Sequence, residues 1–394
     1  MENFQYYAPT KVVFGKGTEN KAGQLVKEQN CRKVLIHYGS GSVKRSGLLD
    51  RIFASLDEEG ISYISLGGVV PNPRLSLVYE GIDLCRREGV DFILAVGGGS
   101  VIDSAKAIGY GVENEGDVWD FYERKRQACG CLPIGVVLTI AAAGSEMSDS
   151  SVITNENGWL KRGYNSSYCR PKFAVMNPEL TMTLPKYQTA SGCVDIMMHT
   201  MERYFNHCDN MELTDGISEH LLRTVMKNAK ILMDEPQCYK ARAEVMWAGS
   251  LSHNGLMACG NDGGDWACHQ LEHELGGMFD VAHGAGLAVL TPGWMQYVYK
   301  DNINMFVQFA VNVMGVEGSY RDPDAIVQEG IARLRTFFKR MGLPGTLAEL
   351  GIGEDRLEEM AKKATGAAFG EESPLGGFKK LYWQDVLAIY KLVK

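Results

Sequence analysis

Three histidines in the second half of the chain, with an aspartate and a histidine upstream, have the spacing of metal ligands. The run HQLEHELGGMFDVAHGAG contains His269, His273 and His283. Upstream, Asp195 and His199 stand four residues apart, as do His269 and His273. Side chains at i and i+4 share one face of a helix, so two such pairs can present ligands to one point. A carboxylate oxygen and imidazole nitrogens suit Zn²⁺ and Fe²⁺ alike.

The surroundings of Asp195 favour a ligand over a solvated acid. Three apolar residues separate it from His199, and an idle charge in such a setting is costly. The five candidates exceed the four positions of a usual site, which leaves one for proton handling or for a cofactor. Glu272 and Glu274 are expected either to be solvated or to form a hydrogen bond to a metal ligand. The remaining histidines of this half have no such partner and are expected at the surface or in the core: His207, His220 and His253.

Small-residue turns in the first half of the chain have the composition of a phosphate cradle. The turn at 97–100, GGGS, follows an apolar strand and precedes a helix. Glycines let a backbone approach a phosphate, and a helix N-terminus directs free N–H groups at it. The turn is not G-x-G-x-x-G, so by itself it is a weak signal, and a turn that binds nothing is the alternative. Two further turns, at 39–42 and 143–146, also follow expected strands, and the carboxyl ends of parallel strands share one edge. Together they indicate a dinucleotide site.

The elements that position these residues differ between the two halves. Up to residue 185, short apolar runs alternate with helical patterns, which predicts a parallel sheet with helices on its faces. The expected strands are 33–38, 63–66, 91–96 and 134–140, and the expected helices are 48–59, 75–89 and 101–109. After Pro185 the apolar spacing becomes three to four and strand signals nearly vanish. The longest helical patterns there are 217–233, 239–256 and 325–341. We therefore expect an α/β dinucleotide-binding domain, 1–185, and an all-helical metal-binding domain, 186–394.

Composition excludes several classes of function. With 394 residues, 45% of them hydrophobic, the chain can bury large cores, and its net charge of −8 argues against nucleic acid and acidic membranes as partners. The N-terminus shows no signal peptide, and the longest apolar run, 132–143, is too short to cross a bilayer. Ten scattered cysteines without a CxxC pair indicate reduced thiols and a cytoplasmic location. A homodimer is expected from the frequency of such assemblies.

These motifs resemble those of the iron-containing (metal-dependent, group III) alcohol dehydrogenases, within them the NADPH-dependent butanol dehydrogenase-like branch. The segment 97–106 resembles the family's pyrophosphate signature, and 139–146 its adenine- and ribose-side turn. The segments 192–199 and 269–286 are similar to its metal-binding signatures. The resemblance extends over essentially the whole chain. It implies the fold that this family shares with dehydroquinate synthases.

Carried over by position, the resemblance implies a role for each motif residue. The metal ligands would be Asp195, His199, His269 and His283, and His273 would be the catalytic residue on the proton path beside the nicotinamide. The implied cofactor-binding residues are Asn72, Gly98, Gly99, Ser100, Asp103, Thr139, Ser145, Lys161 and Leu180. One departure stands out, because Ala143 occupies a position where the family often has threonine.

The first small-residue turn bears on the choice of cofactor. In family members that prefer NAD, the position that faces the ribose 2′ group looks acidic. This chain instead has Gly39, Ser40, Gly41 and Ser42 there, with Lys44 and Arg45 following. Without a carboxylate, nothing repels a 2′-phosphate, and hydroxyl and N–H groups can bind it. NADP(H) is therefore favoured over NAD(H), with Gly39, Ser40 and Ser42 as its contacts.

The expected reaction is hydride transfer between the nicotinamide and a small aliphatic alcohol or aldehyde such as butanol or butanal. One divalent ion, Fe²⁺ or Zn²⁺, would polarise the substrate oxygen while His273 relays the proton. Apolar surface for the substrate is expected from Trp119, Trp159, Trp266, Met197 and Met198. A lyase resembling dehydroquinate synthase is one alternative, but residues 186–290 offer few basic side chains for a phosphorylated substrate. The other is a non-catalytic metal- or nucleotide-binding protein, against which an open coordination position argues.

Overall fold

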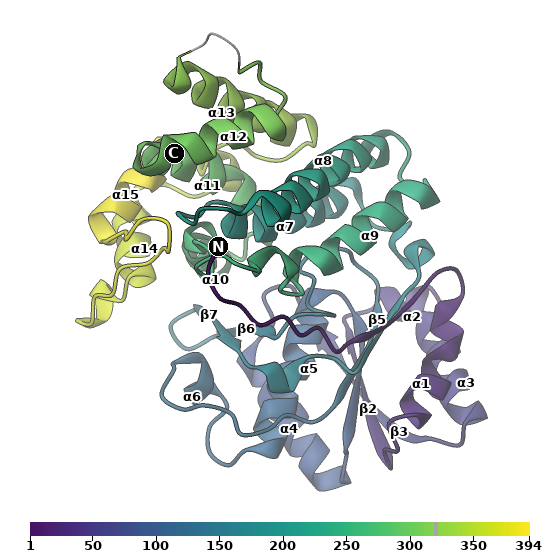
Figure 1. The fold of residues 1–394 in the computed structure, drawn as a ribbon. Helices are drawn as coiled ribbons and strands as arrows, with labels where there is room; N and C mark the ends of the chain where they lie inside the picture. Colours follow the sequence, from purple (N-terminus) through teal and green to yellow (C-terminus); the bar gives the residue numbers. More distant parts are fainter. Residues whose placement is uncertain (319–321) are drawn as a thin grey trace. The chain divides into compact units, whose positions relative to one another are not determined.

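Six parallel strands form the sheet that the first half of the chain predicts. The computed structural model describes residues 1–318 and 322–394. The strand order is β1-β8-β5-β4-β2-β3, every neighbouring pair is parallel, and helices cover both faces (Figure 1). The strands are β1 Lys11–Phe14, β2 Lys33–Gly39, β3 Ser62–Val69, β4 Phe92–Gly97, β5 Ile134–Leu138 and β8 Phe173–Met176. β4 and β5 are buried throughout, because apolar and β-branched residues alternate onto two covered faces.

The described chain divides into two compact units. One comprises Tyr7–Leu184 and Gln237–Ser250, and the other comprises Met1–Tyr6, Pro185–Pro236 and Leu251–Lys394. These units are defined by packing. The domains predicted above, 1–185 and 186–394, stay a prediction.

Two helical layers enclose the sheet of the first unit. α4 and α5 pack their apolar residues on one face, and α1 and α3 on the other. The helices of this unit are α1 Ala22–Lys27, α2 Ser42–Arg45, α3 Leu48–Glu58, α4 Leu75–Glu88, α5 Gly99–Glu113, α6 Trp119–Tyr122 and most of α9 Tyr239–His253, with 3₁₀ turns η1 Thr18–Lys21, η2 Ser167–Cys169 and η3 Pro178–Thr181. α5 is longer than predicted at both ends. An antiparallel hairpin of β6 Ser150–Asn155 and β7 Leu160–Asn165 was not predicted, since its residues are mostly polar.

The second unit is helical, as predicted. Its helices are α7 Lys186–Tyr204, α8 Glu212–Asp234, α10 Ala267–Phe279, α11 His283–Val298, α12 Ile303–Asn312, α13 Pro323–Arg340, α14 Leu357–Ala364 and α15 Trp383–Leu392. Its 3₁₀ turns are η4 Leu256–Ala258, η5 Tyr299–Asn302, η6 Ala348–Leu350, η7 Glu354–Arg356 and η8 Ala367–Phe369. The start of α13 shows why a helix begins there, because Asp322 accepts the N–H of Ala325 and Pro323 takes the first position. The described residues of this unit form no strand beyond a single bridge between Leu375 and Leu381.

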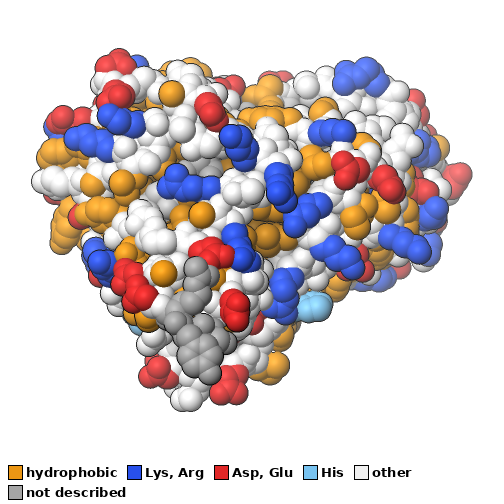
Figure 2. All heavy atoms as spheres, turned by 90° about the horizontal axis from the view of Figure 1, so that it is seen from above, with side chains coloured by type: hydrophobic (Ala, Val, Ile, Leu, Met, Phe, Trp, Pro, Cys, Tyr) orange, Lys and Arg blue, Asp and Glu red, His pale blue; other side chains and the backbone are white. Residues whose placement is uncertain are grey.

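The described surface carries charges of both signs. On the face drawn in Figure 2, basic, acidic and apolar side chains are all present. Among the residues that the structure describes, no helix combines the length and the apolar character that crossing a bilayer requires.

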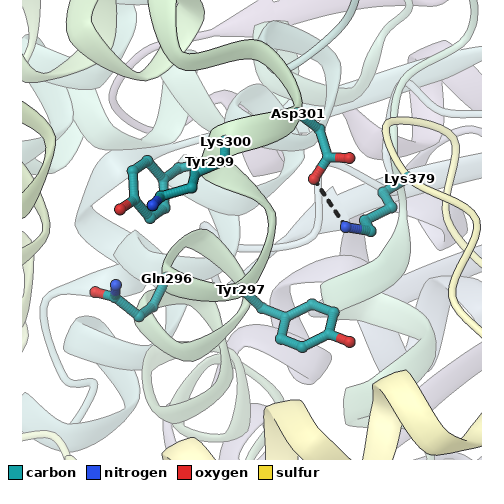
Figure 3. Close-up of a pocket in the computed structure, with 6 residues that line it drawn as sticks. All are labelled: Gln296, Tyr297, Tyr299, Lys300, Asp301 and Lys379. Atoms are coloured by element: carbon teal, nitrogen blue, oxygen red, sulfur yellow. Dashed lines mark hydrogen bonds and ion pairs between the residues drawn. The ribbon is translucent and has the colours of Figure 1, made fainter. Parts of the chain in front are cut away.

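A shallow depression on the second unit is lined by polar groups. Its lining residues are Gln296, Tyr297, Tyr299, Lys300, Asp301 and Lys379, drawn in Figure 3, and its volume is about 530 Å³. Lys379 and Asp301 form an ion pair at 2.9 Å across it. None of the residues predicted for metal, cofactor or catalysis lines this depression, so we do not treat it as the functional site.

Candidate functional site

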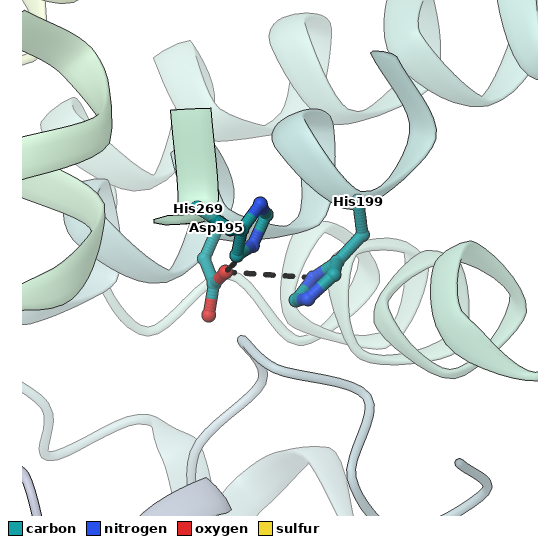
Figure 4. Close-up of side chains that lie close together, drawn as sticks. All are labelled: Asp195, His199 and His269. Atoms are coloured by element: carbon teal, nitrogen blue, oxygen red, sulfur yellow. Dashed lines mark ion pairs between the residues drawn. The ribbon is translucent and has the colours of Figure 1, made fainter. Parts of the chain in front are cut away.

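Four side chains from three helices converge on one carboxylate oxygen. Asp195 and His199 lie one turn apart on α7, His269 lies in the first turn of α10, and His283 is the first residue of α11. The Oδ1 atom of Asp195 lies 3.4 Å from Nδ1 of His199, 3.7 Å from Nε2 of His269 and 3.6 Å from Nε2 of His283. Figure 4 shows the first three side chains pointing toward one another. The structure thus brings together all four residues predicted as ligands.

Unsatisfied buried atoms show that this cluster fits a cation. Oδ1 of Asp195, Nδ1 of His199 and Nε2 of His269 are buried without a hydrogen-bond partner. Leaving polar atoms in this state is unfavourable, and native structures seldom do so without a reason. One ligand atom from each of these residues lies within 4.8 Å of the others. A divalent ion among them would satisfy all three.

The electrostatics of the cluster also favour a cation. Burial lowers the pKa of His199 well below its ordinary value, and the neighbouring imidazoles His253 and His269 lower it further, so His199 is neutral and able to coordinate. Burial also acts to lower the pKa of His269, but the carboxylates of Glu202 and Asp195 more than offset this and raise it to about 9. These carboxylates therefore favour positive charge at this point, which a metal ion would supply once the Nε2 proton of His269 has left.

Two buried glutamates lie behind the histidines. Glu202 contacts Nδ1 of His269, and Glu272 contacts Nδ1 of His283. Glu202 was not singled out from the sequence, although it stands three residues after His199 and so shares its helix face. Glu272 is fully buried, which excludes the solvated alternative and leaves the supporting one. Glu274 is also buried, with Lys363 at 3.6 Å.

Aromatic rings border the cluster. The ring of His253, which was expected at the surface or in the core, lies 4.0 Å from that of His199 between centroids. The rings of Trp266 and His269 meet edge to face, with 5.4 Å between their centroids. The guanidinium of Arg203 lies 4.4 Å from the centroid of the Trp266 ring. Trp266 also has a positive φ of 65°, which is rare for a bulky residue and often accompanies functional sites.

The other residues predicted to offer apolar surface differ in burial and position. Met197 and Met198 are fully buried in α7. Trp119 belongs to the core of the first unit, and Trp159 is exposed at the β6–β7 turn. Trp266 is the member of this set whose ring lies beside those of His199 and His269.

His273 lies beside the cluster but outside its ligand group. It is on α10, one turn after His269, and it is partly exposed. Its ring centroid lies 6.5 Å from that of His283. This position fits a residue that exchanges protons near the site without binding the metal.

The predicted cofactor turns gather at one edge of the sheet. Residues 39–42 follow β2, 97–100 follow β4, 139–145 follow β5, and Leu180 lies in η3 after β8. These four strands are neighbours and parallel, so their carboxyl ends share an edge. Asn72 follows β3 at the same edge with a φ of 52°. Lys161 differs, because it is buried within β7 of the hairpin.

Close packing explains the small residues of these turns. A Cβ on Gly98 would lie 3.0 Å from the side chain of Ile140, and one on Gly99 would lie 2.9 Å from Cβ of Ala143. The turns after β4 and β5 therefore abut, and glycine at positions 98 and 99 avoids a clash between them.

A buried lysine organises the turn after β5. Nζ of Lys106 donates to the carbonyl and hydroxyl oxygens of Ser145, at 2.8 and 2.9 Å, and to the carbonyl oxygens of Ser148 and Ser150 at 3.0 and 2.8 Å. Asp103 accepts a 2.6 Å hydrogen bond from the Ser145 hydroxyl. Lys106 thus fixes the backbone that presents Ser145, and the structure brings the predicted cofactor residues Asp103 and Ser145 together.

Comparison with known proteins places both halves of the chain in one family. Residues 9–178 match the model of iron-containing alcohol dehydrogenase, and residues 189–393 match that of the C-terminal part of the Fe-containing alcohol dehydrogenase family. The chain is 44% identical over 392 residues to the NADH-dependent butanol dehydrogenase A of Clostridium acetobutylicum, covering 99% of each chain. It is 35% identical to the NADPH-dependent aldehyde reductase YqhD of Escherichia coli, covering 92% of this chain and 93% of that one.

A solved structure shows the same fold. The NADH-dependent butanol dehydrogenase A of Thermotoga maritima superimposes with a TM-score of 0.96 at 41% identity, covering 100% of this chain and 99% of that one.

Proposed function

Because the chain belongs to the iron-containing alcohol dehydrogenase family, we propose that it is a metal-dependent dehydrogenase that transfers hydride between NADP(H) and a small aliphatic alcohol or aldehyde. The observation that carries the proposal is the set of buried ligand atoms around Asp195 without hydrogen-bond partners. A divalent ion bound there would act as a Lewis acid on the substrate oxygen. The relatives named as butanol dehydrogenase and aldehyde reductase support a substrate of this size.

Each group of residues has a part in this reaction. Asp195, His199, His269 and His283 would hold the metal, Fe²⁺ or Zn²⁺, since this donor set suits both. His273 would take up or release the proton that accompanies hydride transfer, because it is a partly exposed imidazole one turn from a ligand. Trp266 would exclude water beside the ligands and offer apolar contact to the carbon chain of the substrate.

The turn after β2 supports NADP(H). Between Gly39 and Arg45 no carboxylate is present, whereas Ser40, Ser42 and two basic residues are. Lys44 lies over the ring of Tyr38 at 5.1 Å, so its charge stays close to this turn. The relatives' names include both NADH- and NADPH-dependent enzymes. We therefore base the preference for NADP(H) on the residues of this turn.

The test is reduction of butanal by NADPH with protein purified without oxygen. We expect loss of NADPH absorbance that depends on both substrate and protein, stops after removal of the metal by a chelator, and returns with Fe²⁺ or Zn²⁺. Elemental analysis of the active protein identifies the metal. Activity that persists in fully metal-free protein would contradict the proposal.

A further inference from the structure

Glu202 contacts His269 through both of its carboxylate oxygens. Oε2 contacts Nδ1 of the imidazole, and Oε1 accepts the backbone N–H of His269 at 3.2 Å. The Glu202 side chain is 1% exposed, so this contact lies in the interior. A carboxylate that binds both the backbone and the ring of one residue fixes where that ring points.

Glu272 contacts the ring of another predicted ligand, His283. It lies one turn after His269 on α10, is fully buried, and contacts Nδ1 of His283 at the start of α11. A carboxylate from α7 therefore holds the histidine of α10, and a carboxylate from α10 holds the histidine of α11. Three helices are linked in series by these two contacts.

The glycines after His283 make this arrangement possible. A Cβ on Gly286 would lie 2.8 Å from Cγ of Glu272, so glycine leaves the room that the carboxylate arm occupies. A Cβ on Gly284 would lie 1.9 Å from the carbonyl oxygen of Ser191, so α11 approaches the backbone of α7 directly. The sequence HGAG is thus explained by the close approach of α11 to both neighbouring helices.

We infer that Glu202 and Glu272 are positioning residues that preset two metal ligands. Each carboxylate accepts the Nδ1 proton of its histidine, which leaves Nε2 to take the metal, and in both histidines Nε2 is the nitrogen that faces Oδ1 of Asp195. This inference rests on the proposed function in one respect, namely that a divalent metal resides at Asp195. It assigns to the two glutamates the orientation of the ligand rings.

Charge alone is the competing explanation. Asp195, Glu202 and Glu272 bring three buried carboxylates to one small volume, and these would attract any cation whether or not they orient an imidazole. The two explanations differ for a glutamate shortened to aspartate, which keeps its charge but withdraws its oxygens from Nδ1.

The experiment therefore uses Glu202→Asp and Glu272→Asp. If orientation matters, each variant should raise the dissociation constant of the metal by about 10- to 100-fold, the range typical of such supporting groups. The constant is measured by competition of Zn²⁺ with a chelator. Loading with Co²⁺ gives a second readout, because its visible spectrum reports the coordination geometry, and we expect both variants to change it.

Glu274→Asp is the matched control. Its carboxylate is on the same helix, is equally buried, and lies 3.6 Å from Lys363. The same shortening there should leave the dissociation constant within about twofold of the original. Unfolding of the metal-free proteins, followed by circular dichroism, separates a loss of affinity from a loss of stability.

A second route tests the same arrangement without changing a carboxylate. Gly286→Ala places a methyl group against the Glu272 arm and should weaken metal binding in the same range as Glu272→Asp. This variant keeps the test open if an aspartate variant does not fold.

The outcomes distinguish the inference from the function on which it rests. If the unaltered protein binds the metal and the two aspartate variants bind it equally tightly, with unchanged Co²⁺ spectra, the inference is wrong and the proposed function stands. If the unaltered protein binds no divalent metal and His269→Ala changes nothing, both are wrong.

Discussion

At the scale of single residues, the choice between the two nicotinamide cofactors depends on one short turn. Ser40 follows β2 at the carboxyl edge of the sheet, among residues that carry no acidic group. A carboxylate there would repel the 2′-phosphate of NADP and accept hydrogen bonds from the ribose of NAD. The residue at this position therefore sets the preference between the cofactors.

The variant Ser40→Asp should accordingly shift the ratio of kcat/KM for NADPH over NADH toward NADH by about tenfold or more, which corresponds to about 1.4 kcal/mol or more. Steady-state kinetics with both cofactors measures the ratio. Ser62→Asp introduces the same charge at the start of β3, on the opposite edge of the sheet, and should leave the ratio unchanged. An unaltered ratio in Ser40→Asp would remove the basis for preferring NADP(H).

A second single residue makes stability depend on pH. His37 is fully buried in β2, with Nδ1 at 2.9 Å from the carbonyl oxygen of Leu66 and Nε2 at 2.9 Å from the hydroxyl of Ser104. Burial lowers its pKa from 6.5 to about 4, and the Leu66 carbonyl opposes this shift. The unfolded chain therefore binds a proton more readily than the folded one.

The expected result is a stability contribution that is fully present above about pH 6.5 and is lost as the pH falls toward 4, by at most about 3 kcal/mol. Urea unfolding of the metal-free protein, from about pH 7 down to about pH 4, measures this change in the free energy of unfolding. In His37→Gln the part of the pH dependence due to this residue should vanish. His220→Gln, at an exposed position, should retain it.

At the scale of elements, the turn after β5 depends on the helix that packs beside it. Lys106 comes from the middle of α5, yet its ammonium group holds the carbonyl oxygens of Ser145, Ser148 and Ser150. Lys106 is the last residue of the segment 97–106, which resembles the family's pyrophosphate signature. Its role in this structure is structural, because Nζ donates its hydrogen bonds to oxygens of Ser145, Ser148 and Ser150.

Replacing Lys106 with methionine keeps the bulk of the side chain and removes its hydrogen bonds. Several buried carbonyl oxygens then lose their donor, at about 1–3 kcal/mol each, so we expect a loss of at least about 3 kcal/mol in the free energy of unfolding. Cofactor affinity should fall as well, because Ser145 is no longer held. Urea unfolding and cofactor titration measure the two effects, and Lys172→Met, at an exposed site, is the control. Unchanged values for Lys106→Met would contradict this account.

At the scale of the whole molecule, the metal is expected to act as a cross-link among α7, α10 and α11. The ligands come from three helices, and a metal that binds the folded chain alone stabilises it by mass action. At a free concentration 100 times its dissociation constant, the gain is about 2.7 kcal/mol. Metal binding and stability are therefore coupled.

Removing the metal with a chelator should thus lower the midpoint of thermal unfolding, and adding Fe²⁺ or Zn²⁺ should restore it. Differential scanning calorimetry measures both changes. His269→Ala lacks a ligand and should unfold at the same temperature with and without chelator. A midpoint that the chelator does not move in the unaltered protein would speak against a structural linkage of this kind.

The homodimer stays a prediction, which sedimentation velocity can test.

The alternation of apolar runs and helical patterns was enough to predict the parallel sheet and the helical second half. The candidate metal ligands also came from the sequence, because Asp195 with His199 and His269 with His273 follow the one-turn spacing of a helix. These features depend on local periodicity. The resemblance to a known family then separated His273 from the ligands, which spacing alone left open.

The tertiary structure decided what periodicity cannot encode. Glu202 and His269 are 67 residues apart, and Lys106 and Ser145 are 39 apart, so neither contact leaves a local pattern. Burial of Glu272 and His253 likewise depends on which helices pack against them. The sequence by itself therefore predicted which residues bear the chemistry, and the fold decided which carboxylates and lysines contact them, because such contacts arise only when distant segments of the chain pack together.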